Sequence, residues 1–208
     1  MRTVDTAVVA LAGRRIDPAE AQVPRFPIEN VRDVGRRVRE SLQEMRAVAL
    51  VCSAACGADL VALAQAKELG LRRRVVLPFS PEQFRATSVV DRPGDWGPLY
   101  DEQIATTAAA GDLLVLDGAG GGDAAYAAAN EAIVYEAQAL ASTSHPDKAH
   151  RLIAILVWEG APRPGSDATA RFRDLTRRAG FEEQSISTLS RSLESLSQKL
   201  CRPDVRST

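Results

Sequence analysis

The fold is decided by the stretch Ala47-Val48-Ala49-Leu50-Val51-Cys52-Ser53-Ala54-Ala55-Cys56-Gly57-Ala58-Asp59-Leu60. Its apolar run, residues 47–51, is typical of a strand that is buried on both faces. The small residues 53–59 then predict a loop, and from Leu60 to Leu69 the apolar side chains suit a helix that stops at Gly70. A buried strand that leads through a short loop into a helix is the unit of parallel α/β sheets.

The same alternation continues along the chain in both directions. Apolar runs predict further strands at 7–12, 74–77, 113–116 and 152–158. Helices are predicted at 30–45, where Asn30 would cap the first turn, and at 100–110, 124–141 and 167–179. Parallel strands need long crossovers, and the crossover helices cover the sheet. We therefore predict an α/β fold: a single Rossmann-like domain with a parallel five- to six-stranded sheet and helices on both faces.

We expect that domain to span residues 1–185, and residues 186–208 to form a C-terminal amphipathic helix and tail packed on the same domain. Five apolar residues recur there three or four positions apart, at Ile186, Leu189, Leu193, Leu196 and Leu200. A seam of about two heptads is short for a coiled coil. The alternatives are that the seam forms a homodimer contact, or that it holds partner proteins on a scaffold whose pocket is degenerate.

Composition and charge narrow the range of partners. The 208 residues carry a net charge of −1, with a pI near 6.2, and provide no field that would attract bulk nucleic acid. Residues 1–5 lack a signal-peptide core, and no apolar run approaches the roughly 20 residues of a membrane span. The three cysteines have no zinc-type spacing. We expect a soluble, cytoplasmic protein with reduced thiols and with no membrane association, cofactor or metal. The abundance of arginine over lysine is attributed to genomic base composition.

Three loops of small or glycine-rich residues follow predicted strands. They are Gly13-Arg14-Arg15, Ser53-Ala54-Ala55-Cys56-Gly57-Ala58-Asp59 and Asp117-Gly118-Ala119-Gly120-Gly121-Gly122-Asp123. At the carboxyl edge of a parallel sheet, such loops let backbone N–H groups approach an anion. Because the net charge argues against nucleic acid, the sequence predicts a site for the phosphate groups of a small ligand.

Two of these loops resemble motifs of a known family. Residues 53–59 resemble the S-G-G-A-x-G-A-D signature of the SLOG superfamily, and residues 12–17 resemble its first-strand G-x-R-x-D turn. The superfamily includes Smf/DprA-like proteins, LOG-type phosphoribohydrolases and sensor domains for ADP-ribose-type ligands. Residues 75–79 and 84–89, then Trp96, are similar to a bacterial sensor-type subgroup, and the later segments 126–130 and 156–160, which include Tyr126 and Trp158, fit the same subgroup. The resemblance implies a nucleotide-binding Rossmann-like domain that senses an ADP-ribose-like or cyclic nucleotide signal and passes it to a separate effector protein.

The residues expected to contact this ligand share a position in or near the loops at the carboxyl edge of the sheet. They are Gly13, Arg14, Arg15, Ser53, Ala54, Cys56, Gly57, Asp59, Pro78, Phe79, Thr87, Ser88, Gly120, Gly121, Gly122, Tyr126 and Trp158. Glycine and Ser53 would bind phosphate, an arginine would neutralise it, and an aromatic ring would stack on a base. Two roles remain open for Asp59: stabilising the helix start through the macrodipole, or binding a ribose hydroxyl.

The alternative function is that of a LOG-like enzyme that cleaves or transfers at the N-glycosidic bond of a nucleoside phosphate. Such enzymes carry P-G-G-x-G-T-x-x-E after the fourth strand, but here the glutamate position falls on Tyr126 or Ala127. In this alternative Glu131, Glu136 or Asp123 would be the acid–base group. The missing glutamate favours binding over catalysis.

Overall fold

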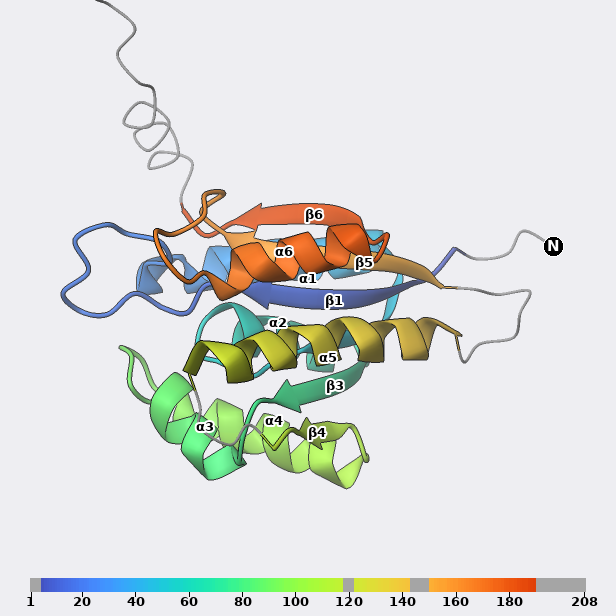
Figure 1. Cartoon of the computed structure of the whole chain (residues 1–208), viewed down its shortest axis with the longest axis horizontal. Helices are drawn as coiled ribbons and strands as arrows, with labels where there is room; N and C mark the ends of the chain where they lie inside the picture. The colour runs from blue at the N-terminus through green and yellow to red at the C-terminus, as the bar shows by residue number, and fades with distance from the viewer. Residues whose placement is uncertain (1–4, 118–121, 143–149, 190–208) are drawn as a thin grey trace, which may run out of the picture.

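The computed structural model describes residues 5–117, 122–142 and 150–189. Its six strands form one parallel sheet in the order β4-β3-β2-β1-β5-β6 (Figure 1). The strands are β1 (Ala7–Gly13), β2 (Ala47–Cys52), β3 (Arg72–Leu77), β4 (Leu113–Val115), β5 (Arg151–Trp158) and β6 (Glu182–Ser187). The predicted α/β class and parallel sheet are confirmed.

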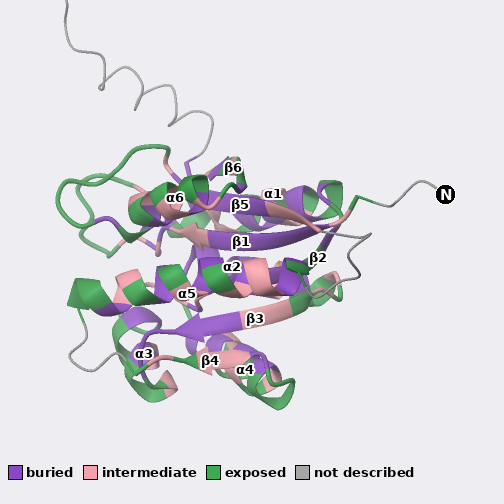
Figure 2. Ribbon diagram, turned by 45° about the vertical axis from the view of Figure 1, so that its right-hand side comes forward, coloured by how far each residue is buried: buried purple, intermediate pink, exposed green. Residues whose placement is uncertain are grey.

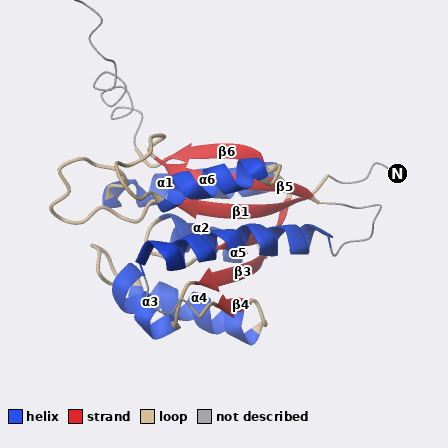
Figure 3. Cartoon of the chain, in the orientation of Figure 1, coloured by secondary structure: helices blue, strands red, loops and turns tan. Residues whose placement is uncertain are grey.

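Helices cover both faces of this sheet (Figure 3). They are α1 (Val31–Glu44), α2 (Ala58–Glu68), α3 (Pro81–Ser88), α4 (Gly97–Ala109), α5 (Gly122–Ser142) and α6 (Ala168–Arg178), with a 3₁₀ turn, η1 (Ile28–Asn30), before α1. α1, α2 and α4 pack on one face, and α5 and α6 pack side by side on the other. The short α3 lies at the carboxyl edge of the sheet (Figure 1).

The core explains why the central strands read as continuous apolar runs. Val9 and Leu11 of β1 belong to the core under α1 and α2, whereas Val8 and Ala10 belong to the core under α5 and α6. Successive strand residues point to opposite faces, so a strand covered on both sides is apolar at every position. Figure 2 shows β1 as buried over most of its length, and its last two residues, Ala12 and Gly13, are intermediate.

The strand order places a crevice beside β1. The chain runs outward through β2, β3 and β4 and then returns to place β5 on the other side of β1. In open parallel sheets, ligands bind outside the carboxyl ends of the strands at such a reversal. The carboxyl ends of β1 and β5, and the loops that follow them, are therefore the part of the fold that positions a site.

Two elements differ from the sequence prediction. Residues 81–88, expected within an irregular connection, form α3, which begins with a proline and whose N-cap Ser80 accepts a hydrogen bond from the Gln83 amide. The edge strand β6 was not predicted because its sequence, Glu-Glu-Gln-Ser-Ile-Ser, has no apolar run. Asn30 is the N-cap of α1, but its side chain caps nothing and instead donates to the Thr188 carbonyl.

The strand β6 also alters the start of the predicted C-terminal helix. Ser187 is the last residue of a strand, and Ile186 and Leu189 are buried in the domain. The other residues of the seam, Leu193, Leu196 and Leu200, lie outside the described residues. Among the helices that the structure describes, none combines the length and the apolar character needed to cross a membrane.

Gly57 is required where the loop after β2 meets the loop after β1. It has a φ of +102°, and a Cβ there would lie 2.7 Å from the Arg14 carbonyl oxygen and 2.8 Å from the Ile16 amide nitrogen. The close approach lets the Ala58 amide donate to the Arg14 carbonyl (3.0 Å) and forms an isolated antiparallel bridge between Arg15 and Gly57. The predicted glycine is thus used to join two loops of the chain.

Replacing this glycine tests the junction. We expect Gly57→Ala to destabilise the fold by about 2 kcal/mol or more, because strain in the backbone adds to a steric clash. Gly70→Ala is the matched control: Gly70 also has a positive φ, +68°, but nothing lies within 4 Å of its Cβ position. The control substitution is expected to lower the free energy of unfolding by only about 1 kcal/mol. Urea unfolding measures both, and equal losses would contradict the steric argument.

Candidate ligand-binding site

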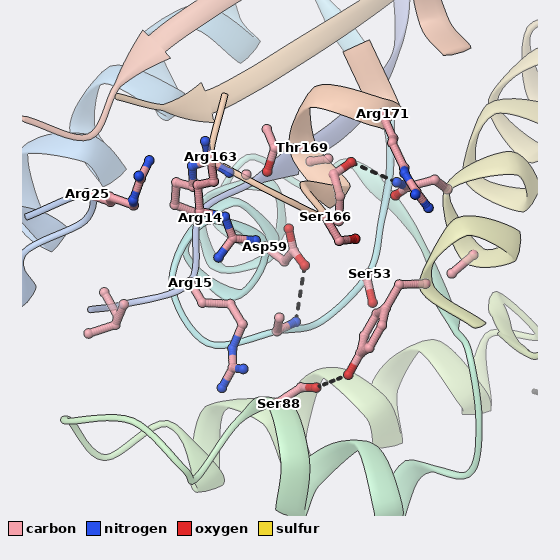
Figure 4. A pocket seen from close by; sticks show the side chains of 18 of the residues that line it. Arg14, Arg15, Arg25, Ser53, Asp59, Ser88, Arg163, Ser166, Thr169 and Arg171 are labelled. Carbon is pink, nitrogen blue, oxygen red and sulfur yellow. Dashed lines mark hydrogen bonds between the residues drawn. The ribbon is translucent and has the colours of Figure 1, made fainter. Parts of the chain in front are cut away.

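A cavity of about 530 Å³ opens at the carboxyl end of β1 (Figure 4). Its walls come from the loops after β1 and β2, from α3, from the first half of α5 and from the start of α6. These segments are far apart in the sequence, and the strand order brings them to one edge of the sheet. The cavity therefore occupies the place at which parallel α/β folds bind ligands.

Six arginines contribute to the cavity wall: Arg14, Arg15, Arg25, Arg92, Arg163 and Arg171. Three aspartates, Asp17, Asp59 and Asp123, also line it. A cluster of this kind in a chain of net charge −1 is a local feature of one site. A guanidinium group can bind a ligand only if its N–H donors are not already bonded to carboxylates of the chain.

Arg14 is held by carboxylates of the chain itself. Its Nε and Nη1 donate to Glu159 (2.6 Å) and Asp167 (2.7 Å), and its Nη2 donates to the Ala161 carbonyl (2.8 Å). The guanidinium also lies over the ring of Trp158, 5.6 Å from its centroid. Burial would lower the pKa of Arg14, but these bonds raise it above its usual value. With its donors engaged, Arg14 ties β1 to the loop after β5 and to α6.

The Asp167 carboxylate, which binds Arg14, is held ionised by several hydrogen bonds. Burial would raise the pKa of its carboxyl, but hydrogen bonds from Arg14 and from the backbone amides of Arg163 and Ala170 outweigh burial and lower it to about 2. The carboxylate is also the N-cap of α6, since it accepts from the Thr169 and Ala170 amides. Arg25 adds a further ion pair to Glu159. The loops after β1 and β5 are therefore joined by charge.

Arg15 points to the opposite wall, as expected for neighbouring side chains in an extended segment. One of its terminal nitrogens pairs with Asp91, in the loop after α3, and the Cys56 thiol interacts with the guanidinium group, while Nε makes no hydrogen bond with any nitrogen or oxygen of the described residues. Among the described residues, five buried side-chain polar atoms have no hydrogen-bond partner. Three of the five, Arg15 Nε, Ser53 Oγ and Arg92 Nε, belong to residues that line the cavity. Buried polar groups are normally satisfied, so these three atoms have hydrogen-bonding capacity that no described residue uses.

Two arginines near the start of α6 have weak internal pairing or none. The Arg163 side chain is as far as 4.0 Å from the Asp167 carboxylate, which Arg14 binds at 2.7 Å. Burial and the nearby charge of Arg14 lower the pKa of Arg163. The exposed Arg171 side chain has no hydrogen bond or ion pair with any described residue. Both guanidinium groups can therefore neutralise a bound anion.

Asp59 is a carboxyl group at the cavity wall with a strongly perturbed titration. It is 8% exposed, and its Oδ2 accepts a hydrogen bond from the Ala55 amide (3.2 Å; dashed in Figure 4). Burial raises its pKa to about 7, against the opposing effects of the Ala55 amide and the charge of Arg15. Near neutral pH the group both donates and accepts protons, which suits a sugar hydroxyl better than a phosphate.

An aromatic group closes the cavity on the side of α3. The Tyr126 hydroxyl shares a hydrogen bond with Ser88 Oγ (2.9 Å), and the Tyr126 ring packs edge-on against Phe79. Phe79 itself is buried and packs against Phe84. Phe79, Tyr126 and Trp158 were expected to offer a ring that stacks on a base. Of these three residues, Tyr126 lines the cavity.

The structure brings together seven of the residues that the sequence analysis assigned to ligand binding: Gly13, Arg14, Arg15, Ser53, Asp59, Ser88 and Tyr126. Eight others do not line the cavity: Ala54, Cys56, Gly57, Pro78, Phe79, Thr87, Gly122 and Trp158. Ala54, Cys56 and Trp158 are buried in the packing between elements. Thr87 donates within α3, to the Gln83 carbonyl. Gly120 and Gly121 lie outside the described residues.

The three acidic residues named for the enzyme alternative are separated. Asp123 lines the cavity, whereas Glu131 is exposed on α5 and Glu136 pairs with Arg74 of β3. Four cavity arginines, Arg25, Arg92, Arg163 and Arg171, were not found from the sequence. The high proportion of arginine was the available signal, and it was attributed to base composition.

Comparisons with known proteins add little to this site. No protein-family model and no curated protein matches the chain. Among solved structures, DNA processing protein A (DprA) from Streptococcus pneumoniae is similar over 93% of this chain, with 16% sequence identity and a TM-score of 0.39. The chain spans 62% of the length of that structure. A similarity of this size carries no argument about a ligand, so the site is interpreted from its own residues.

The pKa of Asp59 predicts how stability depends on pH. An aspartate titrates near 3.9 in the unfolded chain, so the favourable contribution of the protonated form is present below pH 4 and is lost as the pH rises through about 7. We expect Asp59→Asn, whose amide oxygen still accepts from Ala55, to be more stable relative to the unmodified protein at pH 8 than at pH 5.

Urea unfolding at the two pH values measures this difference. Asp174→Asn is the control, because Asp174 is an exposed residue of α6 with no hydrogen bond or ion pair to any described residue. An Asp59→Asn effect that is the same at pH 5 and pH 8 would show that the buried carboxyl titrates normally.

Proposed function

We propose that the protein binds a nucleotide-derived small molecule through its phosphate groups and acts as a sensor of that molecule. The observation that carries the proposal is that three buried atoms of residues lining one cavity, Arg15 Nε, Ser53 Oγ and Arg92 Nε, make no hydrogen bond with any described residue. Phosphate oxygens are acceptors only, and arginine forks match their geometry. The resemblance of residues 53–59 to the SLOG signature supports the same interpretation.

The cavity also offers contacts for the other parts of a nucleotide. Asp59 can bind a ribose hydroxyl, and the ring of Tyr126 provides an aromatic surface for a base. A concave site of about 530 Å³ is in the range of small-molecule sites. Nucleic acid would instead require an extended basic surface, and the net charge of −1 argues against one.

The loops that the site joins support the proposed sensor role. Arg25 pairs with Glu159, its carbonyl accepts from the Thr188 hydroxyl, and the Thr188 carbonyl accepts from Asn30. A ligand that draws Arg25 away from Glu159 would alter the contacts of the chain where it leaves β6. A separate effector protein, or a second copy of the chain, would detect this change.

Catalysis at an N-glycosidic bond is the second candidate, and one observation favours it. Asp59 and Asp123 both line the cavity, and the pKa of Asp59 near 7 suits a general acid or base. Glu131 and Glu136 do not line it. If the protein is an enzyme, these two aspartates are therefore the acid–base candidates.

Ligand binding is tested by thermal stabilisation with ADP-ribose, cyclic ADP-ribose, cyclic dinucleotides, AMP and NAD, followed by analysis of each mixture for breakdown products. We expect at least one intact nucleotide to raise the melting temperature, because a ligand that binds only the native state stabilises it by mass action. Release of a free base would favour the hydrolase, and no stabilisation by any nucleotide would contradict both candidates.

An arginine variant then tests the location of the site. Arg92→Gln removes a guanidinium group whose Nε makes no hydrogen bond and lies 3.7 Å from Asp91, and it is expected to weaken binding by about tenfold or more, since a hydrogen bond to a charged group contributes about 1.5–3 kcal/mol. Arg32→Gln makes the same change of charge on the exposed side of α1. Equal loss of affinity in both variants would place the ligand elsewhere.

A further inference from the structure

The donors around the cavity form two groups on opposite walls. The first, the α3-side group, consists of Arg15, Ser53 and Arg92. The second, the α6-side group, consists of Arg163 and Arg171. Figure 4 shows Arg15 directed toward Ser88 of α3, whereas Arg163 and Arg171 lie on the two sides of the start of α6. The cavity thus presents cations at two places rather than one.

Contacts in the chain hold one member of each group at its own wall. Arg15 pairs with Asp91, in the loop after α3, and the Cys56 amide donates to the Ser88 carbonyl (3.0 Å), which holds the 53–57 loop against α3. On the other wall, the Arg163 amide donates to Asp167 (2.7 Å), the N-cap of α6. Arg15 and the backbone of Arg163 are thus held at different walls of the cavity.

Arg14 and Arg15 maintain this division. Arg14 points toward α6, where Glu159 and Asp167 bind its guanidinium group. Arg14 therefore adds no charge to the α3-side group that contains Arg15. The amides of Thr169 and Ala170 are already occupied by Asp167, so the amino terminus of α6 is not itself the anion site. The available charge on this wall belongs to the arginine side chains.

A carboxyl group lies between the two groups. Asp59 lines the cavity, and Figure 4 shows it beside Arg14, at a level between Arg163 and Arg15. A phosphate in the middle of the cavity would meet this carboxyl, whereas a sugar hydroxyl there would bond to it. The centre of the cavity therefore favours sugar, and its two ends favour phosphate.

We infer that the site is built for a ligand that carries two phosphate groups separated by at least one sugar, such as a nucleoside bisphosphate or a cyclic dinucleotide. One phosphate binds the α3-side group and the other binds the α6-side group. Ligands whose phosphates are adjacent, as in a diphosphate bridge, leave one group unused. This inference rests on the proposed function and chooses among the ligands that the function allows.

Two matched pairs of ligands test the separation in the unmodified protein. Adenosine 3′,5′-bisphosphate and ADP have the same base, sugar and number of phosphates. Cyclic di-AMP and diadenosine diphosphate have the same two adenosines and two phosphates. Isothermal titration calorimetry is expected to show, in at least one pair, that the ligand with separated phosphates binds at least tenfold more tightly. Equal or tighter binding of the adjacent-phosphate ligand in both pairs would overturn the inference.

Single substitutions on each wall provide the second test. Arg15→Gln and Arg171→Gln are each expected to weaken binding of the preferred ligand at least fivefold, and Arg32→Gln is expected to leave it unchanged. Arg171 is exposed and unpaired among the described residues, so its replacement should not affect folding. Loss in only one of the two wall variants, with an unchanged melting temperature, would show a single anion site.

Different results would contradict nucleotide binding and the preference for separated phosphates. If ADP or diadenosine diphosphate binds and the separated-phosphate ligands do not, the protein is a nucleotide sensor and only the inference is wrong. If none of the four ligands and none of the other nucleotides binds, both are wrong.

Discussion

The ion pairs of Arg14 with Glu159 and Asp167 are the interaction on which the ligand cavity depends. They join the end of β1 to the loop after β5 and to the start of α6 in a place that excludes water: Arg14 and Asp167 are each 4% exposed. Removing one partner of a buried ion pair is costly because the remaining charge stays buried. Arg14 therefore acts as a positioning residue that sets the two walls of the cavity rather than as a ligand contact.

The fold could be predicted from the sequence because its central strands are buried on both faces. That environment requires apolar residues at every position, and the resulting runs in β1, β2 and β5 are visible without a structure. The strand β6 lies at the edge of the sheet, where Glu182 and Glu183 are exposed to solvent. Its sequence therefore lacks the apolar run that marks the central strands. The helix α3 had a visible signal, Ser80 followed by a proline, but it is only eight residues long.

The site was predictable only where it is local in sequence. The turn 13–15 and the loop 53–59 could be recognised because each follows a strand, and Arg15 and Ser53 do line the cavity. Nothing near Arg14 in the sequence indicates that carboxylates 145 and 153 positions away would occupy it. Likewise, Arg163 and Arg171 reach the cavity only because the strand order returns β5 to the side of β1.

The central claim is that the unpartnered donors of this cavity hold phosphate. The most direct measurement is anomalous diffraction from crystals of the protein soaked in tungstate, a tetrahedral dianion that resembles phosphate. The account predicts a tungsten peak within hydrogen-bonding distance of Arg15 Nε, Ser53 Oγ or Arg92 Nε. Peaks at exposed arginines outside the cavity, with none at these three atoms, would contradict it.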